Sequence, residues 1–227
     1  GDQEQKIEEL RKAVAGNIST QVIVFVNKYD GIDLPDSTCR ILCLDSMPTH
    51  SSLIDRYAQE MRPDSFIIRR QSSQKIEQGI GRAIRSISDW CIVILTGSKL
   101  TSFVSEKNKR EFLSNETKMQ IKIAEDLAEE MKKETGDTLI TIEKLIQQCL
   151  DREQTWRDYY RKTMDTVELD QLNKDYLEIS KLERDADLQF QNGRYEKAAE
   201  IIQRIIDRSS ETDQGWYFQL MASYLHP

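Results

Sequence analysis

The feature that most constrains this chain is an alternation of short apolar runs with helical patterns over residues 20–97. The runs at 21–26, 41–44, 66–68 and 91–95 are rich in β-branched residues and predict strands. Residues 51–61 and 73–86 lie between them and have helical spacing. Strands that are apolar on both faces and alternate with helices predict an α/β fold with a parallel sheet.

Beyond about residue 110, helical patterns replace strand patterns. Apolar residues recur at three- and four-residue spacing over 117–134, 139–161 and 168–187, which predicts an all-α region. We expect breaks near Gly136-Asp137 and Met164-Asp165. The sequence therefore predicts three parts: an α/β part at 1–110, a helical extension at 111–182, and a helical pattern of a different kind at 183–227.

Composition and charge exclude several classes of protein. The chain has 227 residues, of which 38% are hydrophobic and 31% are charged, and its net charge is −7. The longest apolar run, Val22 to Val26, is too short to span a membrane, and no secretory signal is recognisable. We expect a cytoplasmic, intracellular protein, and the nucleus stays open. The stretch 56–85 is locally basic, which is compatible with a bound polyanion or with a solvated charged face.

The four cysteines have no metal-ligand spacing. Cys39 and Cys43 lie on one face of a predicted strand, which favours core positions. No C-x2-C pair occurs, and His50 and His226 are not placed to join a site. We therefore expect no bound metal among these residues, and reduced thiols.

Two stretches carry chemistry. The first follows the predicted strand at 21–26 and reads Asn27-Lys-Tyr-Asp-Gly-Ile-Asp-Leu-Pro35. Loops that follow the strands of a parallel sheet form its ligand crevice. Here Gly31 permits close approach of the backbone, and Asp33 is an acceptor suited to a ribose hydroxyl or to orienting a cation. By spacing alone, such a loop is more often a simple turn than a ligand site.

The second stretch reads Gln78-Gly-Ile-Gly-Arg-Ala-Ile-Arg85. On a continuous helix, Gln78, Arg82 and Arg85 would share one face. Two guanidinium groups suit a phosphate, which they can bind through paired hydrogen bonds. The alternative is a surface helix that happens to carry two arginines.

Together the two stretches resemble motifs V and VI of the second RecA-like domain of superfamily 2 helicases, in the XPD/DinG-like branch. A strand within Cys39-Arg-Ile-Leu-Cys-Leu-Asp-Ser-Met-Pro48 follows the first, and the strand at 91–95 follows the second. The resemblance covers residues 20–97. It implies that residues 1–110 are part of that RecA-like domain, in an ATP-dependent helicase or translocase that acts on nucleic acid, most often DNA.

The resemblance also implies residue roles. Arg82 and Arg85 would be catalytic arginine fingers, which stabilise charge on the transferred γ-phosphate, and Gln78 would help to position that site. Gly31, Asp33 and Gly81 would bind the nucleotide, while Asn27, Lys28 and Tyr29 would face the nucleic acid. Two departures from the branch are Asp30, where Glu is usual, and Thr96-Gly97, where an Asp commonly closes the strand.

The parts of an ATPase site that bind phosphate and Mg²⁺ are missing from the sequence. No G-x-x-x-x-G-K-[ST] segment and no D-E-x-H or D-E-x-D box occurs. In the resembling family both lie in the first RecA-like domain. We therefore expect the C-terminal part of a larger helicase, inactive alone, with ATP and Mg²⁺ bound mostly by an upstream domain.

The last part, 183–227, is similar to a tetratricopeptide-type helix pair. Gly193 would make the turn, Tyr195 and Ala198 would pack the second helix, and Trp216-Tyr217 would open the next. Such helices would bind a protein partner or dock on the motor, and the alternative is an ordinary helical hairpin.

Two further alternatives stay open. The aromatic residues Trp156, Tyr159 and Tyr160 are compatible with base stacking, but their spacing is more typical of helix packing. For the whole chain, the competing hypothesis is a non-catalytic RecA-like and helical-repeat module for protein interaction.

Overall fold

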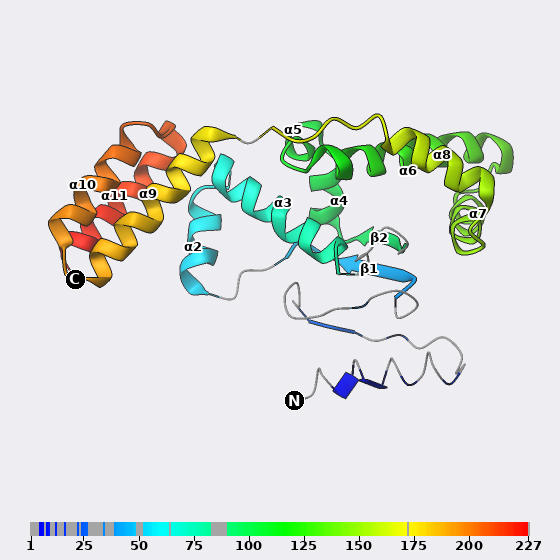
Figure 1. Ribbon diagram of the computed structural model, residues 1–227, viewed down its shortest axis with the longest axis horizontal. Helices are drawn as coiled ribbons and strands as arrows, with labels where there is room; N and C mark the ends of the chain where they lie inside the picture. Colours follow the sequence, from blue (N-terminus) through cyan, green and yellow to red (C-terminus); the bar gives the residue numbers. More distant parts are fainter. Residues whose placement is uncertain are drawn as a thin grey trace. The chain divides into compact units, whose positions relative to one another are not determined.

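The computed structural model is mostly helical and contains a small parallel sheet, which confirms the predicted fold class (Figure 1). It describes residues 5–6, 8–9, 12, 16, 22, 24–26, 34, 39–48, 52–63, 65–82, 90–171 and 173–226. In chain order the elements are β1 (Ile41–Asp45), α2 (Leu53–Met61), α3 (Phe66–Ile80), β2 (Ile92–Thr96), α4 (Ser98–Ser105), α5 (Lys107–Arg110), α6 (Asn115–Thr135), α7 (Thr138–Leu150), α8 (Gln154–Met164), α9 (Lys174–Gln191), α10 (Tyr195–Ile206) and α11 (Glu211–Leu225). Within the described residues, no helix is both long enough and apolar enough to cross a membrane.

Residue contacts divide the chain into two compact units. The first, here called the sheet unit, comprises Gly1–Pro48 and Ser72–Leu169. The second, called the hairpin unit, comprises Thr49–Gln71 and Asp170–Pro227. Helix α3 contributes its first residues to the hairpin unit and the remainder to the sheet unit. The sequence-based boundaries after residues 110 and 182 stay predictions.

The sheet consists of β1 and β2, which pair in parallel with Ile41 opposite Ile92 and Asp45 opposite Thr96. At its carboxyl end the Ser46 N–H donates to the Thr96 carbonyl oxygen (3.0 Å). Gly97 has φ 85°, and a Cβ there would lie 2.8 Å from the Ser46 nitrogen. Both the backbone angle and the close approach therefore require glycine at this strand end.

The predicted strand at 21–26 is not found among its described residues. Val22, Val24 and Val26 have no strand conformation and are 84%, 71% and 80% exposed. An apolar run becomes a buried strand only when a neighbouring strand and a covering layer are available. The described residues supply neither to these three valines.

The predicted strand at 66–68 is also wrong, because these residues form the first turn of α3. Ile67 and Ile68 are 4% and 5% exposed, and Ile67 joins the core of the hairpin unit. A three-residue apolar run does not distinguish a strand from a buried helical turn, so local pattern could not decide this case.

The expected core position of Cys43 is wrong as well. The alternation of β1 places Ile41, Cys43 and Asp45 on its exposed face, whereas Leu44 packs against the core. Cys43 is exposed, and none of the four cysteines forms a disulfide. The period of two was predicted correctly, but the sequence did not reveal which face is covered.

The core of the sheet unit consists of residues from α3, α4 and the segment before α6: Ile76, Leu100, Phe103, Val104 and Leu113. Leu44 of β1 and Leu95 of β2 pack against it. The Glu77 carboxylate accepts a hydrogen bond from the Ser114 N–H (2.6 Å), and the Ser114 side chain in turn caps α6. The second half of α3 is therefore held against α4 and the start of α6.

The ends of helices α6 and α8 coincide with the two predicted breaks, and a third break separates α7 from α8. α6 ends at Gly136 with φ 69°, and α8 ends at Met164, as expected. The expected helix over 139–161 is interrupted after Leu150, where Arg152 has φ 55°. On α8, the Tyr160 hydroxyl accepts a hydrogen bond from Gln120 (2.8 Å), and burial raises the pKa of Tyr160. Tyr160 therefore packs between helices.

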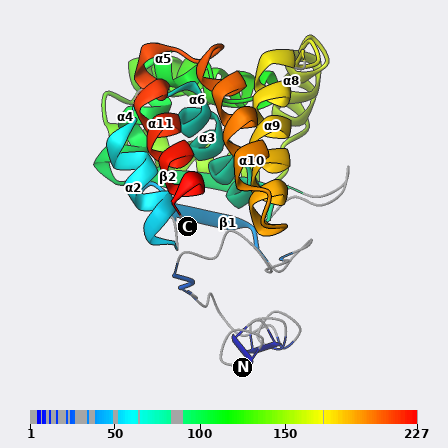
Figure 2. The ribbon, with the colours of Figure 1, turned by 90° about the vertical axis from the view of Figure 1, so that its left-hand side faces the viewer.

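The hairpin unit is built on three successive antiparallel helices, α9, α10 and α11, which lie side by side in both views (Figures 1 and 2). Gly193, with φ 72°, makes the predicted turn between α9 and α10. Ala198 is fully buried, and the Tyr195 ring lies 5.5 Å from Phe190. Trp216 and Tyr217 lie five and six residues inside α11 rather than at its start.

A buried polar cluster joins α2 and its following turn to the C-terminal helices of the same unit. The Arg62 guanidinium lies 3.3 Å from the Asp213 carboxylate and 4.7 Å from the centre of the Trp216 ring. Both charged side chains are almost completely buried. The Tyr217 hydroxyl donates to Glu183 (2.7 Å), and burial raises the pKa of both groups.

Replacing Asp213 with Ala should destabilise the hairpin unit strongly. The Arg62 charge would stay buried without its carboxylate, at a cost of about 3–5 kcal/mol. The control is Arg208→Ala, because Arg208 and Glu178 form an exposed ion pair in the same unit, worth about 1 kcal/mol or less. Urea unfolding followed by circular dichroism measures both. Equal losses for the two variants would contradict the role given to the buried pair.

Glu183 should make the stability of the hairpin unit fall as pH rises. Its folded pKa lies above the unfolded value near 4.5, chiefly because of burial, so the folded state holds the proton more tightly. The stabilisation is complete below that value and is lost as pH rises through the folded pKa. Glu183→Gln keeps an acceptor for Tyr217 and should flatten this dependence between pH 4.5 and 7. Parallel stability curves for both proteins would refute the prediction.

Candidate functional site

The second chemistry-bearing stretch begins on the last turn of α3. The Gly81 N–H donates to the Glu77 carbonyl oxygen (2.9 Å), and the Arg82 N–H donates to Gly79 (3.2 Å). The helix therefore tightens and ends, and Arg82 lies in the turn beyond it. The expectation that Gln78 and Arg82 share a face of one continuous helix is wrong. Two glycines within three residues lower the helix propensity at this point.

A main-chain hydrogen bond brings the two predicted stretches together. The Leu34 N–H donates to the carbonyl oxygen of Arg82 at 3.2 Å. Leu34 directly follows Asp33 in the sequence, and it is 5% exposed. The end of the first stretch thus lies against the middle of the second, although the two bonded residues are 48 positions apart in the sequence.

The residues around this contact differ in their exposure to solvent. Gln78 and Gly81 are exposed, and Arg82 is half-buried. At Gly81, an added Cβ would lie 3.3 Å from the Glu77 carbonyl oxygen, so alanine would fit only with a small backbone adjustment. Gln78 and Gly81 are therefore accessible to a ligand from solvent.

The other predicted site residues lie outside the described residues. These are Arg85 of the second stretch, Gly31 and Asp33 of the nucleotide loop, and Asn27, Lys28 and Tyr29 of the expected nucleic-acid contact. Their assignment stays a prediction. In the described part of the chain, no group of three His, Cys, Asp or Glu residues could hold a metal ion.

A second arrangement, which the sequence analysis missed, lies at the amino end of the sheet. The guanidinium carbon of Arg40 lies 4.3 Å from the centre of the Trp90 ring, and that of Arg152 lies 5.0 Å from it. The Arg40 guanidinium also donates to the Trp90 carbonyl oxygen (2.8 Å). The three residues are far apart in sequence, so no local pattern signals this cation–π cluster.

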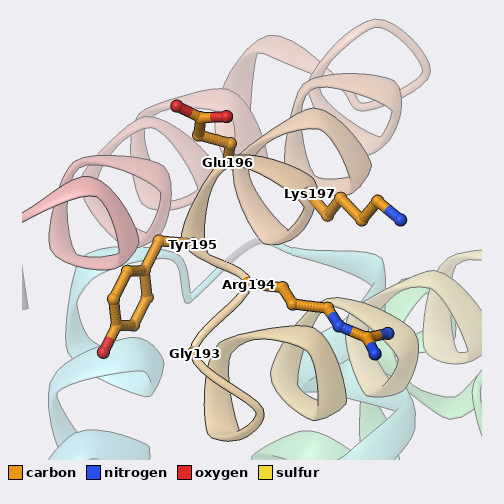
Figure 3. A pocket seen from close by; sticks show the side chains of 5 residues that line it. All are labelled: Gly193, Arg194, Tyr195, Glu196 and Lys197. Carbon is orange, nitrogen blue, oxygen red and sulfur yellow. The ribbon is translucent and has the colours of Figure 1, made fainter.

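A hollow of about 510 Å³ lies at the turn between α9 and α10, lined by Gly193 to Lys197 (Figure 3). Its polar side chains do not converge. Figure 3 shows Tyr195 pointing away from Lys197, and Glu196 pointing in a third direction. The hollow thus lacks the converging polar groups of a small-molecule site.

Comparison with protein families gives the chain its context. A family model described as helicase C-terminal domain matches residues 1–119, which is more than half of the chain. The chain belongs to the helicase C-terminal domain family. Both stretches joined by the Leu34–Arg82 hydrogen bond lie inside the matched region. No curated protein and no solved structure matches the chain.

Substitution of Leu34 and of Gln78 should affect stability to very different extents. Leu34→Ala removes a buried side chain next to the contact and should cost about 2–4 kcal/mol of stability. Gln78→Ala changes an exposed residue and should shift stability by about 0.5 kcal/mol or less. Chemical unfolding of the two variants compares them directly. A large loss for Gln78→Ala would mean that this side chain serves the fold rather than a ligand.

Proposed function

We propose that this helicase C-terminal domain is part of an ATP-dependent helicase or translocase of the XPD/DinG-like branch of superfamily 2, acting on DNA. The observation that carries the proposal is the Leu34–Arg82 hydrogen bond. It joins the two stretches that resemble motifs V and VI, and both must meet at one nucleotide in such an enzyme. Membership of the helicase C-terminal domain family also supports a role in a helicase.

The residues at this contact fit a nucleotide in their chemistry. Arg82 supplies a guanidinium, which suits phosphate oxygens, and the preceding exposed glycine leaves the backbone accessible. Asp33, next to Leu34, supplies a carboxylate suited to a ribose hydroxyl, and Gly31 would let the loop approach. ATP would supply the transferable phosphoryl group, and its Mg²⁺ would be held mainly by another domain, since the sequence has no phosphate-binding loop.

Within that site, each residue has a distinct task. Arg82 and Arg85 would donate hydrogen bonds to the terminal phosphate and stabilise its charge, and Gln78 would help to hold this group in position. Gly81 would keep the turn narrow enough for the phosphate to approach. Asn27, Lys28 and Tyr29 would contact the nucleic-acid strand and transmit its presence to the nucleotide.

The C-terminal helices would add a surface for a protein partner. This rests on their resemblance to a tetratricopeptide-type helix pair and on exposed apolar residues of α11, among them Phe218 and Leu225. The competing proposal, a non-catalytic interaction module, would keep this surface and lose the ATPase.

The deciding experiment measures ATP hydrolysis on the protein extended upstream to include its phosphate-binding domain, with and without single-stranded DNA. Arg82→Ala should lower the DNA-stimulated rate by about 10³-fold, because an arginine finger is worth 10³–10⁵ in rate. Arg82→Lys should recover only part of the rate, since an ammonium cannot make the paired contacts.

The matched control is Arg204→Ala, an exposed arginine on α10, which should leave the rate unchanged. An unchanged rate in Arg82→Ala, or no hydrolysis by the extended protein, would overturn the motor proposal in favour of the interaction module. Stimulation by single-stranded RNA but not by DNA would overturn the assignment of DNA as substrate.

A further inference from the structure

Two cysteine thiols meet at the amino end of the sheet. Cys39 precedes β1 and Cys91 precedes β2, and their sulfur atoms are 4.0 Å apart. Both residues are half-buried. We propose that Cys39 and Cys91 form a disulfide when the protein meets a two-electron oxidant such as hydrogen peroxide, which makes this pair a site of reversible oxidation.

The backbone geometry at this point suits a disulfide. The Ile92 N–H donates to the Arg40 carbonyl oxygen at 2.9 Å, so the two chains are hydrogen-bonded one residue away from each thiol. Extending the register of β1 and β2 places Cys91 opposite Arg40, so Cys39 and Cys91 are offset by one residue. A strand spacing of about 4.8 Å and a rise of about 3.3 Å per residue give a Cα separation of about 6 Å, within the range that disulfides adopt. The sulfurs must close from 4.0 Å to about 2.05 Å, a change that side-chain rotation can supply.

Two arginines contact the residue next to Cys91. The guanidinium groups of Arg40 and Arg152 lie on Trp90, the residue immediately before Cys91.

The other two cysteines, Cys43 and Cys149, serve as internal controls for the oxidation. Cys43 is exposed within β1, the strand that Cys39 precedes, and its thiol lies 3.8 Å from the Thr96 hydroxyl. Cys149 lies on α7, where burial raises the pKa of its thiol. If solvent exposure alone decided which thiol is oxidised, Cys43 would react first. If the proximity of a second thiol decides, Cys39 and Cys91 are oxidised to a disulfide.

The oxidation balances in two steps. The thiolate of one cysteine attacks a peroxide oxygen, so an S–O bond forms, the O–O bond breaks, and the departing hydroxide takes a proton to become water. The second thiol then attacks the sulfur of this sulfenic acid. An S–S bond forms, the S–O bond breaks, and the hydroxide leaves with the thiol proton as a second water.

The disulfide would close a loop that runs from Cys39 to Cys91 and contains β1, α2, α3 and Arg82. Closing so long a loop lowers the conformational entropy of the unfolded chain. It also ties together the chain segments that follow Leu34 and Arg82, the two residues joined by the main-chain hydrogen bond. Oxidation should therefore stabilise the sheet unit and slow hydrogen exchange at the Leu34 amide.

The test exposes the full chain to hydrogen peroxide, blocks the remaining thiols by alkylation, and identifies linked peptides by mass spectrometry without reduction. The expected product is a monomer that has lost two of its four thiols, with one linked peptide pair containing Cys39 and Cys91. Its Tm should rise by several degrees and return to the starting value after dithiothreitol.

Three serine variants make the test specific. Cys39→Ser and Cys91→Ser should each abolish both the linked peptide and the rise in Tm, whereas Cys43→Ser should behave like the unchanged chain. A link that involves Cys43 or Cys149, a link between two molecules, or sulfinic acid on Cys39 or Cys91 without a link would overturn the proposal. This test needs no nucleotide or DNA, so its outcome is independent of the proposed helicase activity.

Discussion

The parallel pairing of β1 with β2 is the interaction on which the sheet unit depends. Five residue pairs in register, from Ile41–Ile92 to Asp45–Thr96, place side by side two segments that are about 50 residues apart in sequence. The core of α3 and α4 packs against Leu44 and Leu95, and Gly97 admits the Ser46 backbone at the carboxyl end. At the amino end the same pairing brings together Cys39 and Cys91, and Arg40 and Trp90. The candidate site precedes both strands, because Leu34 leads into β1 and Arg82 leads into β2.

The way in which α3 ends determines the position of Arg82 in the candidate site. Ile76 is buried in the core. The next residue, Glu77, accepts a hydrogen bond from the backbone N–H of Ser114. These contacts hold the helix up to the point where Gly79 and Gly81 end it. Arg82 then lies in a turn whose carbonyl oxygen is occupied by Leu34. A helix that continued through Arg82 would commit that carbonyl to its own ladder, so ending the helix makes the contact between the two motifs possible.

Features encoded locally were predicted, and features that depend on distant partners were not. The strands at 41–44 and 91–95, their parallel pairing and the turn at Gly193 follow from β-branched runs, strand–helix alternation and glycine. The error at Phe66–Ile68 arose because Ile67 is buried by helices more than 100 residues away. The face of β1 that carries Cys43 depends equally on what covers it. Of the candidate site, the sequence singled out both stretches, but it did not predict that Arg82 would lie beyond the helix.

The composition of the hairpin unit bears on how far the helicase C-terminal domain extends. The family match ends at residue 119, yet Ile67 from inside the match shares a hydrophobic core with α9, α10 and α11. A chain cut after the match would expose Ile67 and leave the Arg62 charge without Asp213. A buried arginine that loses its carboxylate is strongly unfavourable, and an exposed isoleucine adds to the cost. The described contacts therefore tie a segment of the matched region to helices that lie beyond the end of the match.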